Sequence, residues 1–305
     1  MKLSIITINR NNATGLERTL SSTFDAQPGF DDWEQIVVDG ASTDGSFAVL
    51  DKWKDNPHLG WHVSEPDTGL YNAMNKGAAH AQGDYFLFLN SGDELLNDSL
   101  REVFSRTITT DLVVSNMIIH WNGSDRPYFA EKPFRLDPVF FLFLVLPHQG
   151  TLISRRLHED MGGYDESLRF AADHKFFFRC FMERTPSVLW LDKPFSRFYT
   201  DGMSYRYANR KLIHDEWEEM LAPYFGKEIA HRAGLRMEDR PWIRGDVAFQ
   251  AISDRSFSRC LHLLTTGVFQ LWKLAPIRLL LKGMVVMADA IRAVLKKRLC
   301  RSNGV

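Results

Sequence analysis

The stretch Gly83-Asp84-Tyr85-Phe86-Leu87-Phe88-Leu89-Asn90-Ser91-Gly92-Asp93 decides the fold class of this 305-residue chain. Its apolar run predicts a buried strand, and the Asn-Ser-Gly-Asp turn places oxygen atoms where that strand ends. Upstream, short β-rich runs alternate with stretches of helical periodicity, which predicts an α/β fold, a Rossmann-like, mostly parallel sheet flanked by helices. The predicted strands are 3–8, 35–39 and 61–64, and the predicted helices are 13–24, one after Asp44, and 69–81.

Composition and charge exclude several classes of protein. The chain is 45% hydrophobic and 25% charged, which is typical of a globular protein, and its formal net charge of -1 argues against a nucleic-acid partner. Cys180, Cys260 and Cys300 are too few and too scattered for a disulfide framework or a zinc site, so they favour a reducing compartment. The first residues resemble a strand rather than a leader peptide, so we expect a cytoplasmic protein.

The charge is distributed unevenly along the chain. Residues 255–305 contain ten Lys and Arg but a single acid, so we divide the chain into a body, 1–225, and a helical, basic C-terminal region, 226–305. A helix beginning at Pro276 would have one basic and one apolar side, which predicts docking on a membrane surface; packing on the body or on a partner subunit is the alternative. The basic side carries Arg278, Lys282, Arg292 and Lys296, with the acid Asp289 on the same line.

Polar side chains follow the predicted strands, at the edge where α/β sheets bind ligands. Asp39 ends one strand, where its carboxylate can accept hydrogen bonds from a nucleobase or a ribose; a turn-forming aspartate is the alternative. Asp44 is predicted to cap the next helix. The helix that Gly69 opens can direct free N–H groups at an anion. From it Asn75 and Lys76 can reach phosphate or ribose, although exposed helix faces are commonly polar.

Two further carboxylates have the surroundings of catalytic groups. Asp93 closes the oxygen-rich turn, where it can bind a hard divalent cation; a simple turn with Gly92 at positive φ is the alternative. Asp173 precedes an apolar helix, where burial and the helix N-terminus shift a carboxyl pKa in opposite directions. That placement suits a general base, although a helix cap would look the same locally.

Five segments in this order resemble the inverting family 2 glycosyltransferases with the GT-A fold, especially those of bacterial polysaccharide and O-antigen assembly. The segments are 4–11, 38–44, 65–77, 83–93 and 148–173, and the resemblance covers about residues 2–205. It implies that residues 1–225 form the catalytic domain and that the donor is a nucleotide sugar, with a UDP-sugar expected. The residues that it assigns to donor binding are Thr7, Asn9, Arg10, Asp39, Asp67, Gly69, Asn75 and Lys76.

The resemblance also implies roles for the acids of the site. Asn90 and Asp93 stand at the motif that binds the pyrophosphate and a divalent metal, Mn²⁺ or Mg²⁺, and Asp173 would be the base that deprotonates the acceptor hydroxyl. Asp93 is the only carboxylate of the metal motif. The departures from the family pattern are Asn90 and Gly92 in place of acidic residues, Arg10 in place of an aromatic residue, and Ala172 in place of a glutamate.

The acceptor and the location are expectations from the same resemblance. It implies transfer with inversion to a hydroxyl of a polyprenyl-linked glycan, during assembly of a surface polymer such as an exopolysaccharide or a lipopolysaccharide. Such an enzyme would be cytoplasmic and peripheral at the inner membrane. The aromatic residues Phe140, Phe141 and Phe143 would line the lipid side of the cleft or, as we favour, form a buried core strand.

Two other functions are open at this point. A sugar-nucleotidyltransferase would share the α/β body and a metal-pyrophosphate site. It would carry a glycine-rich loop with a basic residue after the first strand, where this chain has Asn9-Arg10-Asn11-Asn12-Ala13. A non-catalytic, membrane-associated scaffold with a degenerate transferase domain would explain Asn90 and Gly92. The sequence is compatible with a monomer or an oligomer.

Overall fold

The computed structural model describes residues 2–25, 30–96, 99–105, 107–129, 136, 140–142, 144–200, 202, 207–228, 230, 231 and 233. The chain divides into two compact units, Met1–Glu216 and Trp217–Val305. The division falls within helix α7, whereas we predicted it at residue 225, where that helix ends. The basic helix predicted to begin at Pro276 lies outside the described residues.

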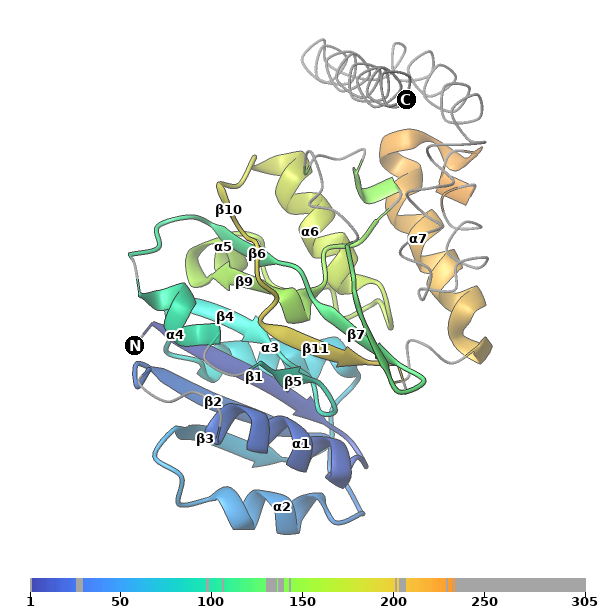
Figure 1. Ribbon diagram of the computed structural model, residues 1–305. Coiled ribbons are helices and arrows are strands. Elements are labelled where there is room, and N and C mark those ends of the chain that lie inside the picture. The colour runs from blue at the N-terminus through green and yellow to red at the C-terminus, as the bar shows by residue number, and fades with distance from the viewer. Residues whose placement is uncertain are drawn as a thin grey trace, which may run out of the picture. The chain divides into compact units, whose positions relative to one another are not determined.

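Strands and helices alternate through the first unit, as Figure 1 shows. In chain order the elements are β1 (Leu3–Asn9), α1 (Ala13–Phe24), β2 (Trp33–Asp39), α2 (Ser46–Trp53), β3 (Leu59–Ser64), α3 (Leu70–His80), β4 (Tyr85–Phe88), β5 (Glu94–Leu95), α4 (Ser99–Phe104), β6 (Leu112–Ser115), β7 (Ile118–Trp121), β8 (Ser124–Pro127), η1 (Phe140–Leu142), η2 (His148–Gly150), β9 (Thr151–Ser154), α5 (Arg155–Asp160), α6 (Ala172–Glu183), β10 (Val188–Leu191), β11 (Ser196–Tyr199), η4 (Tyr207–Asn209) and α7 (Arg210–Phe225).

The main sheet of the described residues has seven strands in the order β10-β6-β9-β4-β1-β2-β3. β1 pairs in parallel with β2 and with β4, and only β9 runs antiparallel to its neighbours β4 and β6. The predicted α/β class with a mostly parallel sheet is therefore confirmed. The chain moves outward from β1 to β2 and β3, and then returns to place β4 on the other side of β1. Ligands of α/β proteins bind at such a switch point, beyond the carboxyl ends of the strands.

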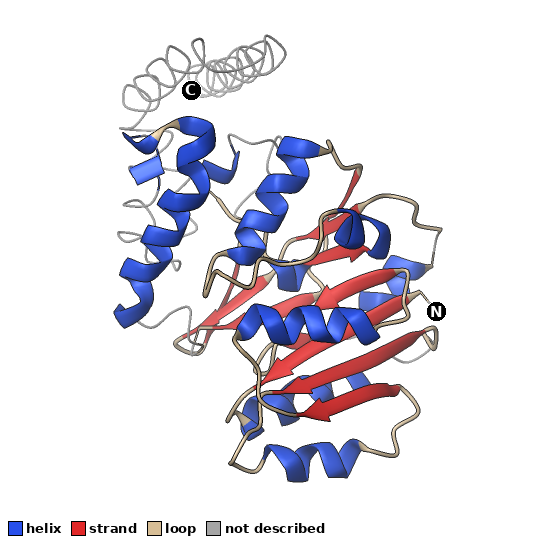
Figure 2. Cartoon of the chain, turned by 180° about the vertical axis from the view of Figure 1, so that it is seen from behind, coloured by secondary structure: helices blue, strands red, loops and turns tan. Residues whose placement is uncertain are grey.

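Helices cover both faces of the sheet, which explains why β1 and β2 are buried along their whole length. On one face, Val37 of β2 packs in a cluster with Leu16 of α1 and Leu50 of α2. On the other face lies α3, which Figure 2 shows in front of the strands. A Cβ atom added at Gly77 of α3 would stand 2.6 Å from Ile6 Cγ2, so this glycine permits the close approach of α3 to β1.

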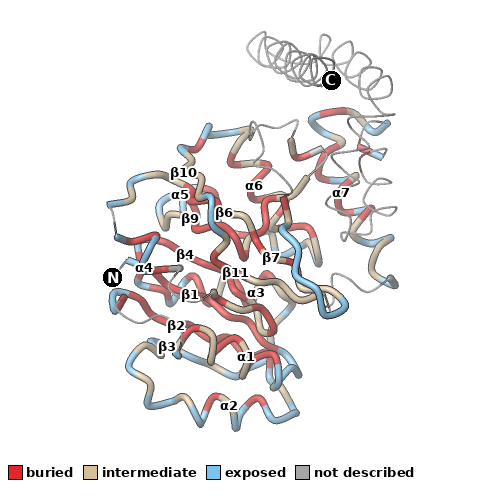
Figure 3. Tube along the Cα trace, viewed as in Figure 1, coloured by how far each residue is buried: buried red, intermediate tan, exposed pale blue. Residues whose placement is uncertain are grey.

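A second sheet of four strands, in the order β5-β11-β7-β8, follows the end of β4. The sequence alternation did not predict it, because its strands are only two to four residues long. Figure 3 shows the β7–β8 hairpin as a largely exposed segment. Its tip, Asn122-Gly123, has φ values of 48° and 75°, as a two-residue hairpin turn requires.

The predicted core strand around Phe140 is wrong. Phe140–Leu142 form the 3-10 helix η1, and Phe143 lies outside the described residues. Phe141 is fully buried against Phe178 and Phe181 of α6. A short apolar run cannot be assigned to a strand from periodicity alone, and here packing against α6, rather than strand pairing, buries it.

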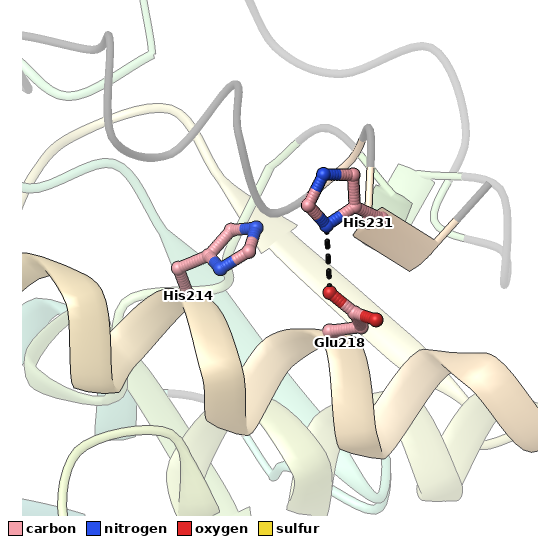
Figure 4. A group of neighbouring side chains, drawn as sticks. All are labelled: His214, Glu218 and His231. Atoms are coloured by element: carbon pink, nitrogen blue, oxygen red, sulfur yellow. Dashed lines mark hydrogen bonds and ion pairs between the residues drawn. The ribbon is translucent and has the colours of Figure 1, made fainter. Parts of the chain in front are cut away.

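The second unit begins within α7, where Trp217 and Leu221 are buried. Glu218 of the same helix accepts a hydrogen bond of 2.8 Å from Nδ1 of His231, as Figure 4 shows. No helix among the described residues combines the length and the apolar character needed to cross a membrane.

Candidate active site

Asp39 ends β2 beside Asn9, the last residue of β1. Asn9 Nδ2 donates to Asp39 Oδ1 over 2.7 Å, Ser42 donates its backbone N–H and its hydroxyl to the same carboxylate, and Ser64 Oγ donates to Oδ2 over 2.6 Å. Asp39 is only 2% exposed. Burial raises its pKa, but these hydrogen bonds outweigh burial and hold the pKa below its ordinary value. Asp39 is therefore an ionised, internally hydrogen-bonded carboxylate at the carboxyl end of β2, beside β1.

Arg10 and Asp67 lie beside this strand end. Arg10 Nη1 is 4.0 Å from Asp67 Oδ1, and the Arg10 side chain is 66% exposed, so its guanidinium plane is available to a ligand. A Cβ atom at Gly40 would stand 2.3 Å from Asp67 Oδ2, so the glycine after Asp39 leaves room for that carboxylate. Thr7 differs: it is fully buried, and its hydroxyl donates to the carbonyl of Leu89 over 2.7 Å. Its role in donor binding stays a prediction.

The start of α3 contributes the next group of predicted residues. Gly69 precedes the helix with φ 151° and ψ 173°, a backbone conformation that glycine alone adopts readily. Lys76 Nζ pairs with Glu65 Oε1 over 2.6 Å. Asn75 donates to the Tyr164 carbonyl and to Glu166, and accepts from the Tyr164 N–H. Asn75 thus fastens the loop that leads into α6, and the donor-binding roles of Asn75 and Lys76 remain predictions.

The turn after β4 carries the two predicted metal ligands. Asp93 is 5% exposed, and its Oδ1 lies 3.4 Å from the Tyr199 backbone N–H. Asn90 Oδ1 is buried and accepts no hydrogen bond from the described residues. A buried carboxylate and an unsatisfied amide oxygen in one turn are the ligand atoms that Mg²⁺ or Mn²⁺ prefers, and substrate phosphates and water usually complete such sites. The residues present therefore fit a divalent cation.

Thr19 of α1 holds this turn in place. Its hydroxyl donates to the Asp93 carbonyl over 2.7 Å and accepts from the Gly92 N–H over 3.0 Å. Gly92 has φ 108°, the positive φ that the alternative of a simple turn requires, and the metal-binding role of this turn stays a prediction. We did not assign a role to Thr19. The sequence feature that could have indicated its role is a polar residue between Leu16 and Leu20, on the face of α1 that packs on the sheet.

Asp173, in the first turn of α6, is the centre of a second hydrogen-bond network. Tyr71 Oη donates to its Oδ1 and His148 Nδ1 to its Oδ2, both over 2.9 Å. Burial raises the pKa of Asp173, but the hydrogen bonds from His148 and Tyr71 outweigh it and hold the pKa below its ordinary value. The side chain is 16% exposed, so an ionised carboxylate is held with part of its surface open.

His148 connects Asp173 to the turn after β4. Its Nε2 lies 3.3 Å from Asn90 Nδ2, while its Nδ1 contacts Asp173. One imidazole ring therefore joins the predicted base to a predicted metal ligand. His148 and Tyr71 lie in the resembling segments 148–173 and 65–77, but we predicted no role for either. The sequence feature that could have indicated a role for His148 is its place directly after Pro147, at the end of an apolar run.

Two other buried histidines, His158 and His174, should make the free energy of unfolding depend on pH. Burial lowers the pKa of His158, beside Arg155, to about 4; it also lowers the pKa of His174 to about 4, although Asp173 opposes this. Because the unfolded chain titrates near 6.5, it binds more protons than the folded chain between pH 6.5 and 4. The free energy of unfolding should therefore fall with falling pH, by about 1.4 kcal/mol per pH unit for each histidine.

Urea unfolding between pH 7.5 and 4.5 measures this dependence. His158→Phe should roughly halve the slope, because it removes one of the two titrating groups. The ring should be accommodated, since His158 is already surrounded by Phe86, Phe88 and Phe176. Parallel curves for the variant and the unmodified protein would contradict the assignment of this slope to His158.

A mostly parallel sheet with acids beyond the carboxyl ends of β2 and β4 agrees with the GT-A fold of glycosyltransferases. The family described as Glycosyl transferase family 2 matches residues 4–178, and the chain belongs to this family. The predicted family, fold class and enzyme class are thereby confirmed: the protein is a glycosyltransferase.

The sequence is similar to those of glycosyltransferases from several bacteria. The chain is 34% identical over 193 residues to an uncharacterized glycosyltransferase of Mycobacterium tuberculosis, covering 61% of this chain and 71% of the relative. It is 30% identical over 190 residues to a PGL/p-HBAD biosynthesis glycosyltransferase of Mycobacterium bovis, covering 58% and 69%. It is 34% identical over 101 residues to a putative teichuronic acid biosynthesis glycosyltransferase of Bacillus subtilis, covering 33% and 39%.

Solved structures of other glycosyltransferases share the fold, and two of them illustrate the likeness. TarS of Staphylococcus aureus, residues 1–349 in complex with UDP-GlcNAc, superimposes with a TM-score of 0.61 at 17% identity, covering 88% of this chain and 81% of that one. A mannosyltransferase from Pyrobaculum calidifontis, in complex with GDP-Man and Mn²⁺, superimposes with a TM-score of 0.55 at 16% identity, covering 96% and 80%. At these identities the likeness concerns the fold alone.

Proposed function

We propose that this glycosyltransferase moves a sugar, with inversion, from a UDP-sugar to a hydroxyl of a polyprenyl-linked glycan in the synthesis of a cell-surface glycan. One observation carries the proposal: an ionised, partly open carboxylate, Asp173, is held one histidine ring away from the turn that fits a metal-diphosphate group. The relatives named for PGL and teichuronic acid biosynthesis support the product class, and the choice of a UDP-sugar follows from the resemblance of the sequence.

In the proposed reaction, Asp173 accepts the proton of the acceptor hydroxyl while that oxygen attacks the anomeric carbon. The new C–O bond forms on one face of the sugar as the bond to the diphosphate breaks on the other, and the bonding electron pair leaves with the diphosphate. A single displacement of this kind inverts the anomeric centre. Because the pKa of Asp173 is lowered, the carboxylate is available as a base throughout the physiological pH range.

The donor would bind at the carboxyl ends of β1 and β2. Asp39 and Asn9 form the rigid floor of this region, and the exposed Arg10 guanidinium offers a plane for stacking on a nucleobase. Asp67 and the N–H groups that follow Gly69 border the same strand ends. We assign donor binding to this group of residues, together with the cation that Asp93 and Asn90 would hold.

The bound cation would neutralise the charge that develops on the departing diphosphate. Removing it with EDTA should lower turnover by about 100-fold or more, corresponding to several kcal/mol of lost stabilisation, and added Mn²⁺ or Mg²⁺ should restore it. Asp93→Asn should lose the same factor and gain little from added metal. Undiminished turnover in EDTA would show that the transfer needs no divalent cation.

The basic region 226–305 supports a peripheral position at the inner, cytoplasmic membrane surface, since its excess of Lys and Arg suits anionic lipid headgroups. This position would bring the catalytic unit to the lipid-linked acceptor.

A nucleotide-release assay tests the proposed function. The purified enzyme is titrated calorimetrically with UDP and Mn²⁺, and then offered UDP-glucose, UDP-galactose, UDP-GlcNAc and GDP-mannose, each with and without octyl glycosides as acceptors. We expect UDP to bind, and one UDP-sugar to release UDP faster when an acceptor is present. Release of pyrophosphate would instead indicate nucleotidyl transfer. Absence of both binding and release would overturn the proposal.

A further inference from the structure

The contacts of His148 define which atoms donate and which accept. Asp173 is ionised, so its Oδ2 can only accept, and His148 Nδ1 must carry the hydrogen of that 2.9 Å contact. In the neutral ring Nε2 then has a lone pair, which faces the Asn90 amide nitrogen at 3.3 Å. Both ring nitrogens are thus used, and the ring cannot turn without breaking both contacts. The His148 side chain is only 12% exposed, which further restricts its movement.

The same contacts restrict Asp173. Its Oδ1 is held by Tyr71 from α3, and its Oδ2 by His148 from η2. Two donors on two different elements leave the carboxylate one orientation. The His148 contact is the one that continues to the end of β4, where the departing diphosphate is expected.

We propose that His148 is a positioning residue that fixes the orientation of Asp173 and ties it to the Asn90 turn. This inference rests on the proposed function, because it assumes that Asp173 is the base. The base and the leaving-group site are then set at a fixed separation by a single ring, and a displacement reaction needs the attacking and departing oxygens in line. His148 touches neither reacting oxygen in this scheme and acts through its two neighbours.

Three substitutions separate the two contacts of the ring. His148→Ala removes both, and kcat should fall by about 100-fold, since a misplacement of about 1 Å can cost that factor. His148→Asn places an amide N–H where Nδ1 stands and keeps the contact to Asp173, so kcat should recover to within about tenfold of the unmodified enzyme. His148→Gln places its amide toward Asn90 instead, so its kcat should stay close to that of the Ala variant.

The assay uses the donor and the octyl glycoside that the release assay identifies, with UDP affinity measured by calorimetry. UDP affinity should stay within about threefold in all three variants, so that the loss lies in kcat. His62→Ala, an exposed histidine on the edge strand β3, is the matched control and should leave both values unchanged. Thermal unfolding of the Asn and Gln variants shows whether a difference in kcat reflects stability.

The outcomes separate this inference from the proposed function. An unmodified enzyme that transfers no sugar would overturn the proposed function and this inference with it. Active enzyme, an inactive Asp173→Asn variant and unchanged kcat in His148→Ala would overturn the role of His148 alone. Recovery by Gln equal to that by Asn would also overturn it, because the contact to Asp173 would then be dispensable.

Discussion

Asp173→Asn should lower sugar transfer by about 1,000-fold while UDP binds as before. The amide has nearly the shape of the carboxylate but cannot accept the proton of the acceptor hydroxyl. Its oxygen can still accept a hydrogen bond from Tyr71 or His148, and its NH₂ group can donate to the other once that partner turns or moves its hydrogen. The fold should therefore persist. Initial rates of UDP release in the presence of acceptor, together with calorimetric titration of UDP, measure the two quantities separately.

A matched control exists for this substitution. Asp111 has the same side-chain exposure as Asp173, 16%, and is also held by hydrogen bonds, here from Ser187 and Arg156. Because Asp111 lies at the opposite, amino end of β6, Asp111→Asn should reduce stability without a comparable loss of turnover. If Asp173→Asn retains turnover within tenfold of the unmodified enzyme, another group removes the proton.

Asp39→Asn should weaken UDP binding by at least about tenfold, or about 1.4 kcal/mol, and lower the free energy of unfolding by about 1–3 kcal/mol. Oδ1 accepts from the Asn9 amide, and Oδ2 accepts from the Ser42 backbone N–H. An NH₂ group in place of Oδ2 meets the Ser42 backbone N–H, which cannot turn away. An NH₂ group in place of Oδ1 meets the Asn9 amide nitrogen, and that amide must turn to offer its buried, unsatisfied Oδ1 instead. Either orientation breaks part of the network, and the loop after β2 should shift.

Calorimetric titration with UDP and urea unfolding test this prediction together. Ser64→Ala removes a single donor to the same carboxylate and should cost only about 1 kcal/mol of stability, with UDP affinity little changed. Equal UDP affinity for Asp39→Asn and the unmodified enzyme would remove Asp39 from the donor site and leave it a purely structural carboxylate.

The elements that the sequence predicted are those with strong periodicity. Helix α1 has the predicted bounds, and the strands ending at Asp39 and Ser64 are present, because continuous apolar runs and amphipathic helices in alternation leave few other arrangements. The short second sheet has strands of two to four residues and offers no periodicity to detect. The strand predicted around Phe140 was wrong for a related reason, because a short apolar segment can be buried equally well as a helical turn.

The candidate site was predictable only in part. Acids at strand ends, such as Asp39 and Asp93, follow from local sequence, because the end of a parallel strand is the binding edge of the sheet. The partners of Asp173 do not follow in the same way. Tyr71 and His148 are 102 and 25 residues away from it, and only the tertiary fold, which brings residues of α3 and η2 to the start of α6, places them at its two oxygens.

The hydrogen bonds that Thr19 makes to residues 92 and 93 order this turn in advance of substrate binding. They are backbone contacts made by a side chain of a packed helix, so the turn has its shape before any donor arrives. The conformational entropy of that turn is therefore lost once, when the protein folds, and not again each time a substrate binds. In the proposed reaction the nucleotide sugar would meet a turn that is already formed, and its binding energy would remain available for alignment of the reacting groups.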